Sequence, residues 1–234
     1  MSEDSEIEAR LAAVRAKRGF LLPHHGLLAI TSQKMLEAYD NAYTELALNP
    51  RVLSAHDREF VWLCILIATD EALATHHIAK FLGAGGTNEE VATAIRLTSW
   101  AVGARAYGFV QDHWRSHLPD LDVAAAYAEA LMDNAAPVPP RVAIPAVASV
   151  HAAHGNWWLL EQAILQAYAH GVPEMELAEA ISLMMFPGSV PRFVEAAGVW
   201  LRLVREGAVA ASPVFAAWAR LQGQGGFDEA SGQR

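Results

Sequence analysis

The chain shows little of the strand-like alternation of apolar and polar residues, and helix start and stop signals recur along it instead. Ser54 and Asp57 stand just before an apolar run that begins at Phe60, and their spacing approximates a capping box. Thr87 and Glu90 form a full capping box directly after a glycine-rich turn. These signals predict an all-α protein.

The helices that we expect lie between these signals, and two segments fall outside them. The segment 134–140 contains three prolines and is the expected linker between two halves of the chain, while the Gly-rich polar tail is expected to fray. We therefore divide the chain into an N-terminal helix (1–19), a first half (20–135), a second half (136–222) and a flexible tail (223–234). The expected helices are 3–17, 32–47, 55–68, 70–83, 88–101, 103–116, 121–135, 140–153, 156–170, 174–186, 189–205 and 212–222.

An internal repeat supports the division into halves. A shift of 86 positions aligns the chain with itself over 37 positions without a gap. The identical pairs are Ile78/Ile164, Gly85/Gly171, Ala92/Ala178, Ala94/Ala180, Ile95/Ile181, Leu97/Leu183 and Trp114/Trp200. We interpret the two halves as copies of one helical unit that consists of a helix, a glycine turn, a helix, a kink and a helix.

Composition limits the classes of partner and compartment. The 234 residues are 53% hydrophobic and 18% charged, which suits a chain with a sizeable buried core. The net charge of −9 disfavours nucleic acid and an anionic membrane as partners, because both attract basic proteins. The N-terminus lacks the apolar segment of a signal peptide, and the longest apolar run, 60–68, is too short to span a bilayer. We therefore expect a cytoplasmic protein that binds neither nucleic acid nor a membrane.

Three segments carry a resemblance to a known family. They are R58-E-F-V-W-L, then D70-E-A-L-A-T-H-H-I-A-K-F-L-G-A-G, and then T87-N-E-E-V-A-T-A-I. In this order and spacing they resemble the carboxymuconolactone decarboxylase / alkylhydroperoxidase D-like superfamily, over most of residues 20–115 and more weakly over 140–205. The resemblance implies a duplicated alkylhydroperoxidase D-like helical bundle that associates with itself as a dimer or trimer.

The redox chemistry of that family requires residues that this chain lacks. In the redox branch two cysteines lie seven and four residues before a key histidine, which matches His77. Those positions hold Asp70 and Leu73, so the thiolate that would attack a peroxide is missing. The lone cysteine, Cys64, lies within an apolar run and is expected to be an inert core residue. Thiol peroxidase activity is therefore not expected.

The decarboxylase branch of the family offers a closer match. Glu71 corresponds to one of the acidic residues that precede the histidine in that branch, whereas Leu73 occupies the place of the second. The resemblance implies a cofactor-independent lyase or isomerase acting on a small carboxylated or lactone metabolite of aromatic catabolism, with no metal. In the second half the matching positions hold Asn156, Trp157 and Ala163, so that half lacks both the acid and the histidine.

Residue roles follow from this resemblance and from helical geometry. On a helix over 70–83, Asp70, Leu73 and His77 would share one face. His77 would then act as the general acid/base, because an imidazole exchanges a proton near neutral pH, and Glu71 or Asp70 would orient it. Leu73 would belong to the apolar floor of the substrate cavity.

Two arginines and a tryptophan complete the expected site. Arg58 or Arg105 would hold a substrate carboxylate through paired hydrogen bonds, and Trp157 would wall the pocket. The same side chains also have structural interpretations, as ion pairs and core contacts. In that case the chain is a non-catalytic oligomeric or small-molecule-binding protein of the same fold. A hydrolase that uses the same histidine and acid is a third possibility.

Histidine spacing also raises the question of a metal. His151 and His154 lie three residues apart and would share a helix face. No third ligand lies within sequence reach, so we expect no metal site.

Overall fold

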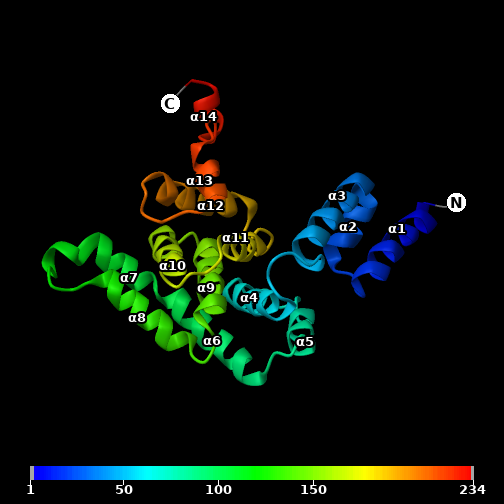
Figure 1. Cartoon of the computed structure of the whole chain (residues 1–234). Helices are drawn as coiled ribbons and strands as arrows, with labels where there is room; N and C mark the ends of the chain where they lie inside the picture. The colour runs from blue at the N-terminus through cyan, green and yellow to red at the C-terminus, as the bar shows by residue number, and fades with distance from the viewer. Residues whose placement is uncertain (1–2, 233–234) are drawn as a thin grey trace. The chain divides into compact units, whose positions relative to one another are not determined.

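The computed structural model describes residues 3–232, and over that range the chain contains helices and turns but no strand (Figure 1). This confirms the predicted all-α class. Within the described residues, no helix is both long enough and apolar enough to cross a membrane. The structure divides into two compact units, and the boundary between them along the chain lies between Asn49 and Pro50.

The first unit is a small helical bundle. It consists of α1 (Glu3–Arg18), α2 (Pro23–Thr31), α3 (Gln33–Tyr43) and a π-helical turn, η1 (Thr44–Leu48). Its apolar core is formed by Val14, Ala29 and Leu36. Helix α2 falls between the helices expected at 3–17 and 32–47 and was not predicted. Residues 20–49 thus form one compact unit with α1 rather than with the helices that follow.

The second unit contains the remaining helices. They are α4 (Ala55–Ala68), α5 (His76–Gly83), α6 (Asn88–Gly103), α7 (Arg105–Phe109), η2 (Val110–Trp114), η3 (Arg115–His117), α8 (Val123–Ala135), α9 (Pro140–His154), α10 (Trp157–Ala169), α11 (Glu174–Leu183), α12 (Val190–Arg205), α13 (Pro213–Arg220) and α14 (Gly226–Ala230). Short α14 lies within the tail that was expected to be flexible, and its residues are exposed.

Helices α4 and α9 form the centre of this second unit. They pack against each other, and each also contacts α6 and α11 (Figure 1). Every residue of α9 from Val142 to Ala153 is buried. A helix that is apolar on all sides is stable only when neighbours cover it all round, and α10 covers a further face of α9. Helix α4 is similarly enclosed from Arg58 to Leu66.

The helix expected at 70–83 is shorter than predicted. Asp70 adopts a left-handed backbone conformation, with φ of 56°, directly after α4. The backbone N–H of Glu71 donates to the carbonyl of Leu66, which completes a helix-terminating Schellman arrangement. The next helix, α5, therefore begins only at His76. The prediction that Asp70 and His77 share a helix face was wrong for this reason.

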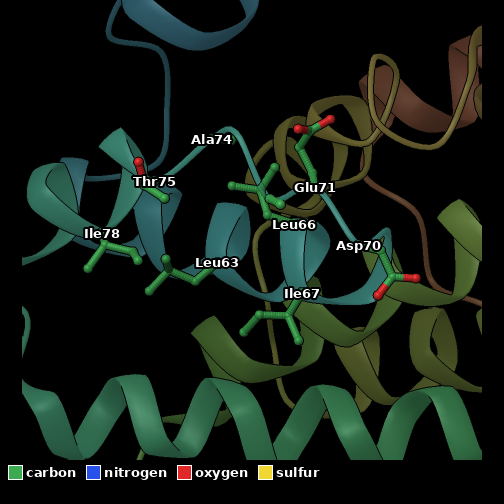
Figure 2. Close-up of a pocket in the computed structure, with 9 residues that line it drawn as sticks. Leu63, Leu66, Ile67, Asp70, Glu71, Ala74, Thr75 and Ile78 are labelled. Carbon is green, nitrogen blue, oxygen red and sulfur yellow. The ribbon is translucent and has the colours of Figure 1, made fainter.

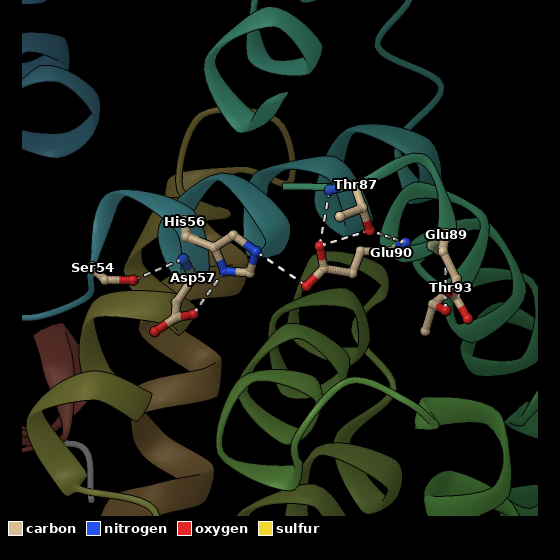
Figure 3. Close-up of polar contacts among 7 residues, drawn as sticks. All are labelled: Ser54, His56, Asp57, Thr87, Glu89, Glu90 and Thr93. Atoms are coloured by element: carbon tan, nitrogen blue, oxygen red, sulfur yellow. Dashed lines mark hydrogen bonds and ion pairs between the residues drawn. The ribbon is translucent and has the colours of Figure 1, made fainter. Parts of the chain in front are cut away.

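Both predicted capping signals are confirmed, and a histidine connects them (Figure 3). The Ser54 hydroxyl accepts the N–H of Asp57, and Thr87 and Glu90 form a reciprocal capping box. The His56 ring contacts Asp57 through Nδ1 and Glu90 through Nε2, each at 3.1 Å. This chain of contacts ties the start of α4 to the start of α6.

Candidate functional site

His77 lies at the start of α5 and is almost completely buried. Its exposed fraction is 1%, and its Nδ1 is 2.6 Å from Oε2 of Glu59, which projects from α4. Glu59 is itself only 2% exposed. A carboxylate and an imidazole withdrawn from water together form a strong, charge-assisted hydrogen bond. Because Nδ1 is engaged by Glu59, Nε2 is the ring nitrogen left to exchange a proton with another group.

Aromatic and basic side chains surround this buried pair. The Trp62 indole stacks on the His77 imidazole, with ring centroids 4.6 Å apart and planes 29° apart. Arg58 Nε lies 3.9 Å from the second oxygen of Glu59. Burial lowers the pKa of Lys80, one turn after His77, and Arg58 lowers it further, while the attraction of Glu59 opposes both. Glu59 is therefore the acidic centre of a largely buried polar cluster between α4 and α5.

An open pocket of about 420 Å³ lies beside this cluster (Figure 2). Its walls come from the C-terminal part of α4, the turn after it and the start of α5. The lining residues are Leu63, Leu66, Ile67, Asp70, Glu71, Ala72, Ala74, Thr75 and Ile78. Figure 2 shows the carboxylates of Asp70 and Glu71 toward one end and Ile78 toward the other. Two of these nine residues are acidic and none is basic.

The pocket and the buried pair are adjacent but separate. Leu63 lines the pocket and lies one helical turn after Glu59, on the same face of α4. On α5, Thr75 and Ile78 line the pocket on either side of His77 in the sequence, but His77 itself does not. A molecule in the pocket would therefore reach the imidazole only if the turn between α4 and α5 moves.

Three of the residues predicted for the site, Asp70, Glu71 and Leu73, lie in the turn between α4 and α5. Asp70 and Glu71 line the pocket, and one oxygen of Glu71 accepts the backbone N–H of Leu73. Leu73 is 61% exposed and does not line the pocket. The carboxylate that orients His77 is thus Glu59, in place of the expected Asp70 or Glu71.

The remaining predicted residues are placed elsewhere. Arg58 is buried beside Glu59, so it belongs to the polar cluster and not to the pocket wall. Arg105 is exposed at the start of α7, and Trp157 is half-buried at the start of α10. Neither of them lines the pocket between α4 and α5.

Sequence reasoning missed Glu59 and Trp62 as members of the cluster. Glu59 was quoted only as part of a motif, although an acidic residue directly before the run Phe60–Ala68 is itself a signal. Acidic residues are almost never fully buried unless they are paired. A buried glutamate in such a helix therefore requires a partner, and its presence could have prompted a search for one.

The two histidines considered as metal ligands take different partners. His151 Nε2 lies 2.9 Å from the Tyr127 hydroxyl, and His154 Nε2 lies 2.8 Å from the carbonyl oxygen of Ala68. Among the residues that the structure describes, no group of three or more metal-ligating side chains lies close enough to hold an ion.

The site can therefore be described by its geometry: a buried imidazole–carboxylate pair, a stacked indole and an apolar pocket with acidic residues at one end. A comparison with known protein families, with curated proteins and with solved structures finds no match to this chain.

Proposed function

We propose that the second unit is a duplicated alkylhydroperoxidase D-like bundle. The shift of 86 positions supports this, because it carries the start of α6 to the start of α11, the end of α5 to the end of α10 and the end of α4 to the end of α9. It also carries the positive φ of Gly85 to that of Gly171. Three backbone hydrogen bonds of the glycine turn recur in the same register. In the first half the N–H groups of residues 84, 85 and 86 donate to the carbonyls of residues 80, 82 and 81, respectively. In the second half the N–H groups of residues 170, 171 and 172 donate to the carbonyls of residues 166, 168 and 167.

Helix contacts support the duplication independently of the sequence. The contact of α4 with α6 corresponds to that of α9 with α11, and the contact of α6 with α9 corresponds to that of α11 with α4. The pattern of helix contacts is therefore unchanged when the helices of one half are exchanged for the equivalent helices of the other half. This is the pattern expected when two copies of one unit pack around a pseudo-twofold axis.

The comparison between halves supports a functional role for the buried polar cluster. At the positions that correspond to Glu59, Trp62 and His77, the second half has Pro145, Ala148 and Ala163, all buried. The second half forms equivalent helices without these polar groups. The fold therefore does not require them, and burying charged groups without need is costly. The presence of this cluster in only one half therefore supports a functional role for it.

We propose that this chemistry is proton transfer by a cofactor-independent lyase or isomerase. His77 is the general acid/base and exchanges the proton through Nε2, while Glu59 fixes the orientation of the ring through Nδ1. The observation that carries the proposal is the 2.6 Å contact between Nδ1 of His77 and Oε2 of Glu59, two residues that are only 1% and 2% exposed.

The lining of the pocket favours one of the two expected substrate classes. Asp70 and Glu71 lie in the wall and no basic side chain does, so the pocket repels a carboxylate. The predicted carboxylate ligand Arg105 is not in the wall. A neutral lactone suits the apolar surface of Leu63, Ile67 and Ile78 better than a carboxylated acid does.

The burial of His77 favours a second candidate function, a non-catalytic small-molecule-binding protein. With 1% of its surface exposed, the imidazole does not reach the pocket in this conformation. In this second candidate the pocket binds its ligand and the buried pair only stabilises the structure.

Deuterium exchange separates the two candidates without knowledge of the natural substrate. The butenolide 2(5H)-furanone, a small unsaturated lactone, is incubated with the protein in D₂O, and the ring C–H signals are followed by proton NMR. Proton transfer predicts exchange above the buffer rate that is lost in His77→Gln and Glu59→Gln. If wild-type protein binds the lactone but does not accelerate its exchange, the binding function is correct and the enzyme proposal is wrong.

Self-association as a dimer or trimer remains part of the proposal. Large apolar side chains of α5 and α6, including Ile78, Leu82 and Ile95, are more than 40% exposed. Light scattering on the purified protein would test this directly.

A further inference from the structure

The Trp62 indole nitrogen is a buried hydrogen-bond donor that lacks an acceptor among residues 3–232. The side chain as a whole is 2% exposed. Buried donors are rarely left without a partner, because losing the hydrogen bond to water is unfavourable. The other buried indole follows that rule, since Trp200, which is 4% exposed, donates to the Tyr168 hydroxyl.

The position of this donor connects it with the proposed chemistry. The Trp62 ring stacks on His77, so the donor lies in the buried cluster. Trp62 itself does not line the pocket, and a ligand therefore reaches its N–H, as it reaches the imidazole, only when the turn between α4 and α5 moves. The corresponding residue of the second half is Ala148, so the fold is built without an indole at this point. An indole N–H can only donate, so the missing partner must be an acceptor.

We infer that the Trp62 N–H donates to the carbonyl oxygen of the ligand bound beside His77. This inference rests on the proposed function, and it adds an electrophilic group to it. When His77 Nε2 takes a proton from the carbon that is conjugated with the carbonyl, the C–H electron pair moves into the conjugated system and negative charge develops on that oxygen. The N–H of Trp62 stabilises this charge, and His77 returns the proton to the same carbon or to another carbon of the conjugated system.

The substitution Trp62→Phe removes the N–H and keeps an aromatic ring over His77. The probes are 2(5H)-furanone and 2,5-dihydrofuran, a ring of the same size without the carbonyl. A lost hydrogen bond should weaken furanone binding roughly threefold to tenfold and leave dihydrofuran binding unchanged. Trp158→Phe, which removes an indole N–H outside the cluster, is the matched control and should change neither affinity.

A measurement on the wild-type protein keeps the test valid if Trp62→Phe does not fold. The indole N–H signal of Trp62, assigned by selective labelling, should move downfield in ¹H–¹⁵N NMR spectra when furanone is added, and should not move downfield with dihydrofuran. An unmoved signal, or a failure of the wild-type protein to bind furanone, overturns the inference.

The two proposals fail in distinguishable ways. If His77→Gln abolishes deuterium exchange but the indole signal stays unmoved, the enzyme proposal survives and the role of Trp62 is wrong. If the indole signal shifts but no exchange occurs, Trp62 is a carbonyl-binding residue and proton transfer is wrong.

Discussion

The buried pair of His77 and Glu59 predicts an unusual pattern of stability in a double-mutant cycle. Replacing His77 by leucine leaves the Glu59 carboxylate in a site where it is 2% exposed and its nearest cation, Arg58 Nε, lies 3.9 Å away. Removing one partner of a buried, hydrogen-bonded pair of ionisable groups typically costs about 3–5 kcal/mol. Glu59→Leu should be similarly costly, because it leaves the imidazole without its hydrogen-bond partner.

The double variant should be more stable than either single variant. Replacing both members of a buried pair by apolar side chains of similar volume is often neutral or even stabilising. The proposed duplication supports this expectation, since a shift of 86 positions places the buried apolar residues Pro145 and Ala163 at the positions of Glu59 and His77. We expect Glu59→Leu/His77→Leu to lie within about 1–2 kcal/mol of the wild-type protein, which corresponds to a coupling energy of several kcal/mol.

The measurement is urea unfolding followed by circular dichroism and by tryptophan fluorescence. Circular dichroism reports the helices of both units, whereas all seven tryptophans lie in the second unit, so coincidence of the two signals tests whether the whole chain unfolds in one step. The control cycle uses Arg202 and Glu161, a more exposed pair for which a coupling energy below about 1 kcal/mol is expected. Additive effects at Glu59 and His77, or single variants as stable as wild type, would refute the description of this pair as buried and interdependent.

Three further predictions concern other titratable groups. Burial lowers the pKa of His56, but the contacts of the ring with Asp57 and Glu90 outweigh that effect and raise the pKa above its usual value. The contribution of His56 to stability is therefore complete below about pH 6.5 and declines as the pH rises. The Tm difference between wild type and His56→Gln should shrink from pH 6 to pH 8. Burial, aided by His154, lowers the pKa of His151 to about 3. As the pH decreases from 6.5, the free energy of unfolding should therefore decrease by at most about 1.4 kcal/mol per pH unit. His151→Gln should reduce that slope in urea titrations. Burial raises the pKa of Cys64 to about 12, so a thiol-reactive dye should label the protein only after denaturation.

Features set by local sequence were predicted well. The capping box of Thr87 and Glu90 depends on residues three apart, and both its hydrogen bonds are present. The start and end of α4, at Ala55 and Ala68, also agree with the expected helix. These boundaries are decided within one or two turns of chain, and a sequence pattern contains that information.

Features set by contacts between distant residues were not predicted. Glu59 meets His77 across 18 residues of sequence and two helices, so the nearer acids Asp70 and Glu71 seemed better partners. The late start of α5 was missed because Asp70 takes a left-handed conformation that glycine usually occupies. In both cases tertiary structure outweighed the short-range pattern.

The burial of α9 has a consequence for any attempt to shorten the protein. This helix belongs to the second half, yet α4 and α6 of the first half cover part of its surface. Cutting the chain at the turn before Pro140 would expose apolar surface on both fragments. We therefore expect neither half to fold on its own, so that a shortened version of this protein must keep both.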